Sequence, residues 1–547
     1  MEDQKTPQTE SLSSQAKITA QEVHPEIKKA AVNPSATAAQ SYPPYVPRNI
    51  RPAYIAFKAR VTSPKGLIIT VLSILLSILF TETILLGSAG VSIPIFAIAF
   101  YGVLFYFFRE NEKQLNKVAI YLTAPVLLLA FSYFIHYNPS TQFITWLTLI
   151  GLICIQLILL SNIQVNGIFS FDMFVKIIVN LVGKPFSNLG MPFNSFTILK
   201  GNKSKAVRNA IYILIGLALA LPVAAILMSL FMSADAVFAD SMNTVYDFIG
   251  LDFTNIFLDI VFGLIFGLFF AAMLLGLKYS GEKQKSAKKI GNNIESTIIG
   301  TFLIIINIFI ITFVAFQFVY LFGGTVNITA SGMSYADYAR RGFFELSTAS
   351  GIIFAIALFV LIMTKRKGEK LPLWIQFTTV CLCVCNSVLL VSAVKRMLLY
   401  VDVYGLSVKR VLTLWFMCII GLCLAWIIIK CFVDKIDLMK WIGLTVILSV
   451  CVLSLTNTER IIAKYNVDRY LSSPSHNSID IYYLGQLSYT TVPEIVRLKD
   501  LKEGTIKNID IKGILKNQEA RLTHRNRLYG FTLDSIESRK ILDSELK

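Results

Sequence analysis

Eleven apolar runs lie between Gly66 and Leu455, and this feature limits the chain to one class of fold. A helix that rises about 1.5 Å per residue needs runs of this length to cross a hydrocarbon layer of about 30 Å. The runs cover residues 66–87, 91–108, 118–136, 143–160, 209–232, 253–277, 297–322, 342–363, 373–394, 411–429 and 441–455. Because the second contains Pro94 and the last is short, the expected range is ten to twelve spans. We expect an all-α, polytopic helical membrane bundle.

The composition agrees with this class of protein. Hydrophobic residues make up 55% of the chain and charged residues 16%, whereas soluble domains carry about 45–50% and about 25%. The net charge of +17 would suggest nucleic acid in a soluble chain. Here most Lys and Arg residues lie in short loops beside apolar runs, where they set orientation and meet lipid headgroups. The lipid bilayer is the expected partner, and nucleic acid is not.

The basic residues also predict an orientation. If the N-terminus is inside, the loops 109–117, 161–208, 278–296, 364–372 and 430–440 are cytoplasmic, and they hold 21 Lys and Arg residues. The outer loops 88–90, 137–142, 233–252, 323–341 and 395–410 hold 6. Cytoplasmic loops carry the excess of Lys and Arg in membrane proteins. The N-terminus is therefore expected in the cytoplasm, and an odd number of spans places the C-terminal tail outside.

Three regions follow from these patterns. Residues 1–62 hold seven of the 17 prolines and show no apolar periodicity, which predicts a disordered N-terminal region. Residues 63–456 form the multi-span transmembrane domain, and residues 457–547 a small, mainly helical soluble tail. Within the tail, Thr490 and Thr491 before Pro493 read as a helix start, and 534–546 reads as a helix.

One cytoplasmic loop contains an amphipathic pattern. Asp172, Lys176 and Asn180 recur four residues apart, and apolar residues occupy the other side of the same helix. Two interpretations stand: a helix that lies in the membrane interface, or a loop helix that packs under the bundle.

A charged ladder marks the entrance to the eighth span. Asp337, Arg341 and Glu345 fall four residues apart, so one helix face carries negative, positive and negative groups in turn, with Arg340 beside them. Two interpretations stand. Either the charges of the ladder neutralise one another and have only a structural role at the start of the helix, or they bind an ion or a headgroup.

Acidic residues also recur at one depth. Glu82, Asp259 and Glu345 each lie roughly 5–9 Å below the predicted outer end of a span. Intramembrane charges are candidates for function, which leads to the hypothesis of an outward-facing polar vestibule for a cation, a cationic peptide or a lipid headgroup. The alternative is three carboxylates near helix ends that reach interfacial water. Asn307, Gln317 and Asn386 inside spans are expected to form hydrogen bonds between helices.

Several motifs resemble a known family. They are Ser233–Phe238, Tyr335–Leu346, Tyr404–Ser407, Ala463–Arg469, Tyr483–Leu484, Leu487–Ser488 and Val492–Pro493. Residues 208–496, roughly, resemble the domain-of-unknown-function 4153/4173 family of polytopic bacterial membrane proteins. The resemblance implies a helical bundle in the cell (plasma) membrane and brings no activity with it.

The function is judged from what the motifs contain and lack. The sequence has no nucleotide-binding glycine loop, no His-Glu-x-x-His and no Gly-x-Ser-x-Gly, so no cofactor, metal or catalytic residue is assigned, and an enzyme is less expected than a non-enzyme. The leading hypothesis is a binding or sensing module with an acidic outward-facing layer, working with a membrane or signalling protein. A secondary transporter or channel for a cation or small cationic solute is the first alternative, and a lipid-modifying intramembrane enzyme is the second.

Overall fold

The computed structural model describes most of the chain after residue 60. The described residues are 61–85, 87–109, 115–200, 231–249, 253–279, 294–322, 343–365, 371–473, 478–501, 506, 509–525 and 530–546, with isolated positions between 209 and 230. The predicted N-terminal region 1–62 therefore lies almost wholly outside the described residues, as does most of the predicted fifth span, 209–232.

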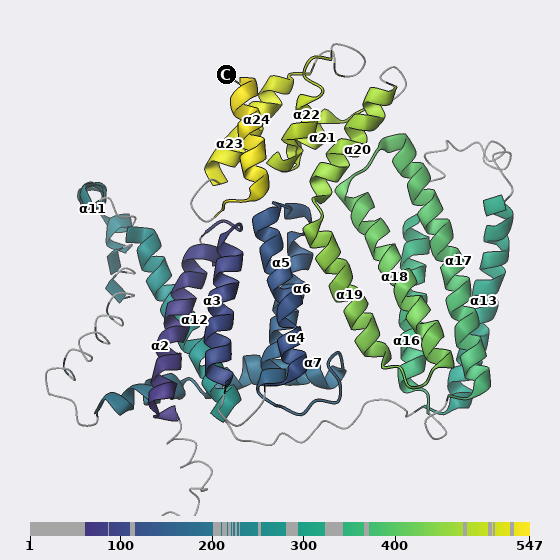
Figure 1. Ribbon diagram of the computed structural model, residues 1–547, viewed down its shortest axis with the longest axis horizontal. Coiled ribbons are helices and arrows are strands. Elements are labelled where there is room, and N and C mark those ends of the chain that lie inside the picture. Colours follow the sequence, from purple (N-terminus) through teal and green to yellow (C-terminus); the bar gives the residue numbers. More distant parts are fainter. Residues whose placement is uncertain are drawn as a thin grey trace, which may run out of the picture. The chain divides into compact units, whose positions relative to one another are not determined.

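The described part of the chain is a helical membrane bundle, as predicted. Nine of its helices are long and apolar enough to cross a membrane, and a tenth, α3, is shorter. The helices at or near this length are α2 (Pro64–Phe80), α3 (Ser92–Phe108), α5 (Thr123–Ile135) with α4 (Lys117–Tyr121), α6 (Pro139–Leu160), α12 (Phe253–Tyr279), α13 (Ser296–Phe322), α16 (Phe343–Met363), α17 (Leu373–Tyr404), α18 (Val408–Phe432) and α19 (Leu438–Leu455). Ten of the eleven predicted spans thus correspond to observed helices (Figure 1).

Two predicted boundaries were wrong. The ninth span was expected to end near residue 394, but α17 continues to Tyr404, because no helix breaker occurs before Gly405, whose φ is 75°. The segment 233–252 was expected to be a loop, but it contains α11 (Ala236–Ile249), where Asp235 Oδ1 accepts hydrogen bonds from the backbone N–H groups of Val237 and Phe238.

Buried apolar side chains form two clusters in the bundle. The first joins α2, α3, α5, α6, the end of α12 and part of α19. The second joins α13, α16, α17, α18 and the start of α19. α19 therefore contributes buried side chains to both clusters.

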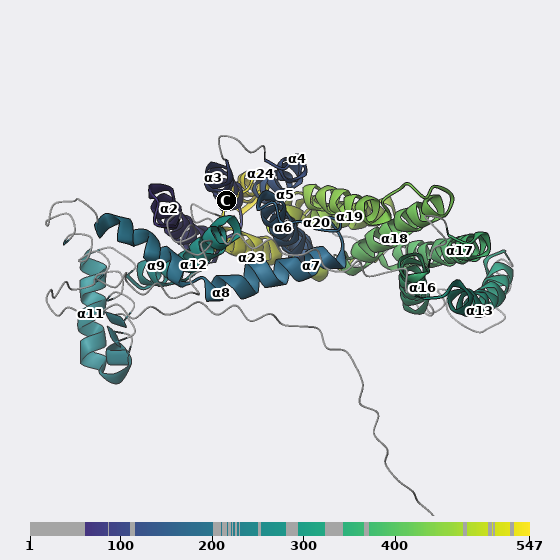
Figure 2. The same ribbon diagram turned by 90° about the horizontal axis from the view of Figure 1, so that it is seen from below.

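Short elements fill the long loop after α6. They are α7 (Phe171–Ile177), η2 (Ile178–Gly183), α8 (Lys184–Ser187), α9 (Gly190–Ser195) and η3 (Phe196–Lys200). Figure 2 shows α7, α8 and α9 following one another across the ends of the bundle.

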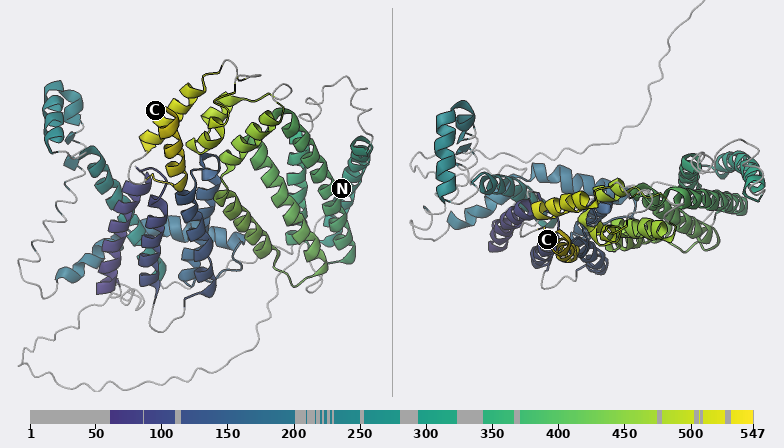
Figure 3. Two further views of the ribbon diagram at one scale, coloured as in Figure 1. Left: turned by 45° about the horizontal axis from the view of Figure 1, so that its top comes forward. Right: turned by 90° about the horizontal axis from the view of Figure 1, so that it is seen from above.

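The tail is helical and has its own core. Its elements are α20 (Thr458–Ser472), α21 (Ile481–Gln486), η4 (Tyr489–Thr491), α22 (Val492–Val496), α23 (Ile511–Arg525) and α24 (Leu533–Leu546). The predicted helix start at Pro493 and the predicted helix over 534–546 are confirmed by α22 and α24. The tail core also includes Tyr137, Leu406 and Val408 from the bundle, so the tail packs on the connections of the membrane helices (Figure 3).

Contacts between loops show which connections lie at each end of the bundle. At the tail end, the Val91 N–H donates to the Phe531 carbonyl at 2.9 Å. At the other end, Lys65 Nζ donates to the Arg109 carbonyl at 3.1 Å, and the Lys365 N–H donates to the Ile294 carbonyl at 2.8 Å. In each contact, both partners belong to connections that the sequence assigns to the same side of the membrane.

Candidate functional site

α2 and α12 pack antiparallel at very short range. An ideal Cβ on Gly267 would lie 2.6 Å from Ile74 Cα, and one on Gly263 would lie 3.0 Å from Ile78 Cα. Glycines four residues apart allow membrane helices to approach this closely, because no side chain separates the backbones. The spacing sets the register: Ile74 faces Gly267, and one turn further on Ile78 faces Gly263.

The same register brings together two predicted site residues. Glu82 follows Ile78 by four residues, and Asp259 precedes Gly263 by four, so the next turn of the crossing pairs Glu82 with Asp259. Their carboxyl groups lie close enough to interact electrostatically. Asp259 is only 6% exposed, and its Oδ1 is buried without a hydrogen-bond partner among the described residues. We call Glu82 and Asp259 the acidic pair.

The backbone around Glu82 is unusual. α2 gives way at Thr81 to η1 (Thr81–Leu85), a π-helical turn that carries Glu82. The hydroxyls of Thr81 and Thr83 donate to the carbonyl oxygens of Ser77 and Leu79. π-helical turns occur frequently at functional sites, and η1 ends the α2 span where the carboxyl groups meet.

The chemistry of the acidic pair follows from charge. One carboxyl group can donate a hydrogen bond to the other only if it holds a proton. Two ionised carboxylates that lie side by side repel each other, and the apolar bundle around them strengthens this repulsion. The pair is therefore suited to hold a proton or another cation between its oxygens.

The structure does not bring all six candidate residues together. Glu345 lies at the start of α16, is exposed, and belongs to the helices of the second cluster. α16 packs on α17 and α18, whereas Glu82 and Asp259 lie where η1 and α12 meet. Asp337, Arg340 and Arg341 lie outside the described residues, so the ladder stays a prediction.

The three polar residues predicted to link spans do so. Asn307 Nδ2 of α13 donates to the Thr378 carbonyl of α17 at 3.1 Å. Asn386 Nδ2 of α17 donates to the Ser350 carbonyl of α16, also at 3.1 Å. Gln317 Oε1 of α13 accepts hydrogen bonds from the Ser392 hydroxyl and the Arg396 guanidinium of α17, at 3.3 and 3.0 Å.

A second polar constellation was missed from the sequence. His136 lies in the connection between α5 and α6, and its Nδ1 is 3.0 Å from the Asp534 carboxylate of α24. The same carboxylate accepts a hydrogen bond from Asn457 Nδ2 at 2.9 Å. Asn138 Nδ2 donates to the Thr456 carbonyl at 3.0 Å. These partners are 77 to 398 residues apart, so no local motif could have shown them.

Glu459 anchors the same junction. Glu459 is 2% exposed, and its carboxylate accepts a hydrogen bond from the Ser140 hydroxyl of α6 and one from the Ser488 N–H at 2.6 Å. Beside it, Tyr489 stacks on Tyr137 and shares a hydrogen bond with Thr532, and burial raises the pKa of Tyr489 to about 12. The buried polar contacts fix the tail to α6.

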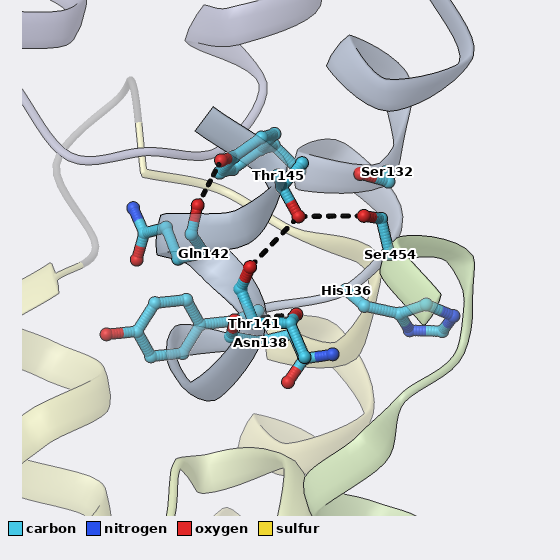
Figure 4. A pocket seen from close by; sticks show the side chains of 9 residues that line it. Ser132, His136, Asn138, Thr141, Gln142, Thr145 and Ser454 are labelled. Carbon is cyan, nitrogen blue, oxygen red and sulfur yellow. Dashed lines mark hydrogen bonds between the residues drawn. The ribbon is translucent and has the colours of Figure 1, made fainter. Parts of the chain in front are cut away.

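Two cavities lie at this junction. The smaller, of about 10 Å³, has room for one water molecule and is lined by polar side chains of α5, α6 and α19, among them Thr145 and Ser454, which share a hydrogen bond at 2.7 Å (Figure 4). The larger is open, of about 600 Å³, and lies between Ser88, Tyr137 and α23. Among its described lining residues Arg521 carries the only charge, and its Nη1 already donates to the Gln486 and Leu487 carbonyls.

Three of the sequence motifs meet at the turn between α17 and α18. Asn466 of α20 makes two hydrogen bonds with the backbone of Leu406, at 2.7 and 2.9 Å. Arg469 Nη2 donates to the Val403 carbonyl at 2.8 Å, and Tyr483 accepts a hydrogen bond from the Val408 N–H at 2.9 Å. The motifs 404–407, 463–469 and 483–484 thus form one contact between bundle and tail.

The comparisons agree with the resemblance seen in the sequence. The family model described as Domain of unknown function (DUF4153) matches residues 123–498, from the start of α5 to just beyond α22. The matched segment includes Asp259 and the motif turn but not Glu82, α23 or α24. No curated protein and no solved structure matches the chain. Because the family model covers more than half of the sequence, the chain belongs to the DUF4153 family of domains of unknown function.

Proposed function

We propose that this chain is a binding or sensing protein of the bacterial cell membrane, and that the acidic pair takes up a cation from the outer side. One observation carries the proposal. Asp259 is almost fully buried, has a carboxylate oxygen without a partner among the described residues, and lies beside a second carboxyl group. Buried ionisable groups in a membrane are costly, which makes them candidates for function.

The electrostatics of the pair favour a cation over an anion. Asp259 is buried and faces the Glu82 carboxyl, and both groups become negative when they ionise. No described ion pair joins either residue to a basic side chain. A proton or a small metal cation would relieve the repulsion and supply the missing partner of Asp259 Oδ1.

The outer location rests on the basic residues. Glu82 precedes the connection that holds Val91, which contacts the tail, so the acidic pair belongs to the tail end of the bundle. The opposite end carries the basic loops that favour the cytoplasm. We infer that the tail and the acidic pair share the outer side.

A cation transporter is the second candidate, and the π-helical turn η1 favours it. Transporters bind ions where membrane helices are interrupted or end inside the bundle, and α2 ends in η1 beside the acidic pair. A binding site for sensing needs no path through the bundle, whereas a transporter does, so a flux measurement separates the two.

Carbodiimide labelling tests the acidic pair directly. Dicyclohexylcarbodiimide modifies protonated carboxyl groups in apolar surroundings, and peptide mass spectrometry locates the adduct. For the full chain in vesicles, we expect an adduct on Asp259 or Glu82 that decreases as Na⁺, K⁺ or Ca²⁺ is added at constant ionic strength, or as the pH rises. Asp259→Asn and Glu82→Gln each remove that protection.

Glu345→Gln is the matched control, because it removes an exposed acidic residue of another helix. It should leave labelling and protection unchanged; if it abolishes protection, the site is the shared vestibule. Absence of any adduct on the pair at every pH, with folded protein, would overturn the proposal. Cation flux into vesicles that is lost in Asp259→Asn would show that the protein is a transporter rather than a sensor.

A further inference from the structure

The loop helices after α6 present their polar side to the protein. We call residues 169–195 the belt. Asp172 and Lys176 form an ion pair at 3.1 Å with both side chains 6% exposed, and Asn180 is buried one turn further on. The Asn166 N–H donates to Asp172 at 2.9 Å, and Lys176 donates to the Gln164 carbonyl. The polar residues predicted from the sequence therefore hold the belt against the loop that precedes it.

The opposite side of the belt is apolar and exposed. Its residues are about 40–60% accessible, a fraction that soluble proteins seldom allow for a continuous row of large apolar side chains. They are Phe171, Phe174, Ile178, Val182, Phe186, Leu189 and Phe193. A helix in water would place these two sides the other way round, with charges outward.

The belt touches three membrane-spanning helices. The Phe169 ring lies against Gly443 of α19, the Asn188 side chain against Gly276 of α12, and the Ser195 hydroxyl 3.0 Å from the Thr70 hydroxyl of α2. Phe186 also packs edge-on against Phe269 of α12 at 5.3 Å between ring centroids. The exposed row is thus continuous with the outer surface of the spans.

These contacts set the depth of the belt. Thr70 lies six residues inside α2, Gly443 five residues inside α19, and Gly276 three residues from the end of α12. At about 1.5 Å per residue, the belt lies roughly 5–9 Å inside the ends of these helices. Helices that lie in a membrane interface bury their apolar side to about 5–10 Å.

We propose that the exposed apolar row of the belt is embedded in lipid acyl chains, in the leaflet at the end of the bundle opposite the tail. The occupant is lipid because the row lies at acyl-chain depth, continues the surface of the spans, and turns its charges inward. The belt then ties α19 to α2, which leads into η1 and Glu82, and to α12, which carries Asp259. The inference does not depend on cation binding.

Photocrosslinking in vesicles of phosphatidylethanolamine and phosphatidylglycerol tests the occupant. p-Benzoylphenylalanine replaces Phe174 or Phe186 in the full chain, and mass spectrometry identifies what each position captures. Phe377 is the positive control, because it is 66% exposed and lies at a similar depth on α17. Tyr482 of the tail, 63% exposed, is the negative control.

We expect phospholipid adducts at positions 174 and 186 within about twofold of position 377, and roughly tenfold above position 482. Capture of a second copy of the chain or of another protein at position 174, without lipid, would overturn the inference. A lipid yield at position 174 as low as that at position 482 would do the same. Because aromatic replaces aromatic at exposed positions, the folded protein is retained, and its size-exclusion profile checks this.

Discussion

Gly267→Ala is expected to destabilise the protein by about 2 kcal/mol, although alanine ordinarily favours a helix over glycine by about 1 kcal/mol. The new Cβ would lie 2.6 Å from Ile74 Cα, so α2 and α12 must separate. This separation also displaces the acidic pair, which lies two helical turns further along the crossing. Unfolding of the purified protein in mixed micelles measures the loss of stability, and carbodiimide labelling measures the loss of cation protection.

Gly351→Ala of α16 is the matched control for this variant. A Cβ at Gly351 meets nothing within 4 Å, so the helix gains propensity without a clash, and its stability should stay the same or rise. If Gly267→Ala and Gly351→Ala behave alike, the close crossing of α2 and α12 does not exist as described.

Gly405→Ala should release the tail from the bundle, at a cost of about 2–3 kcal/mol. The φ of 75° is strained for alanine, and the new Cβ would lie 2.3 Å from Asn466 Oδ1. The two hydrogen bonds between Asn466 and Leu406 would then be lost together. Limited proteolysis measures the result as faster cleavage of the tail while the membrane domain stays intact.

Gly421→Ala, in the middle of α18, controls for glycine replacement away from the turn, because a Cβ there has open space. It should leave the cleavage rate of the tail at the wild-type value. Asn466→Ala should reproduce the release without changing backbone strain. A tail that stays protected in both Gly405→Ala and Asn466→Ala would show that the motif turn does not hold it.

The membrane helices could be predicted because hydropathy is a local property of the sequence. Errors arose where tertiary contacts decide. Lys395 and Arg396 indicated a loop, yet both lie inside α17, where Gln317 of α13 accepts a hydrogen bond from Arg396. A charged residue continues a membrane helix when a neighbouring helix supplies its partner.

The candidate site was predictable only in part. Glu82 and Asp259 were found as single intramembrane acids, but their pairing depends on the register of two helices that are far apart in sequence. Gly263 and Gly267 carry that information, since glycines four residues apart on the α12 face continue the spacing of Asp259. His136 and Asp534 offered no such signal, because their contact exists only once the tail has docked.

Labelling of intact cells with a membrane-impermeant maleimide tests most directly whether the tail and the acidic pair share the outer side. The probes are Tyr482→Cys in the tail and Lys365→Cys at the opposite end; both native side chains are exposed. Cys418, the exposed native cysteine, lies within α18, away from water. We predict that position 482 is labelled in intact cells and position 365 only after the membrane is opened. Labelling of position 365 in intact cells, with position 482 protected, would contradict the account.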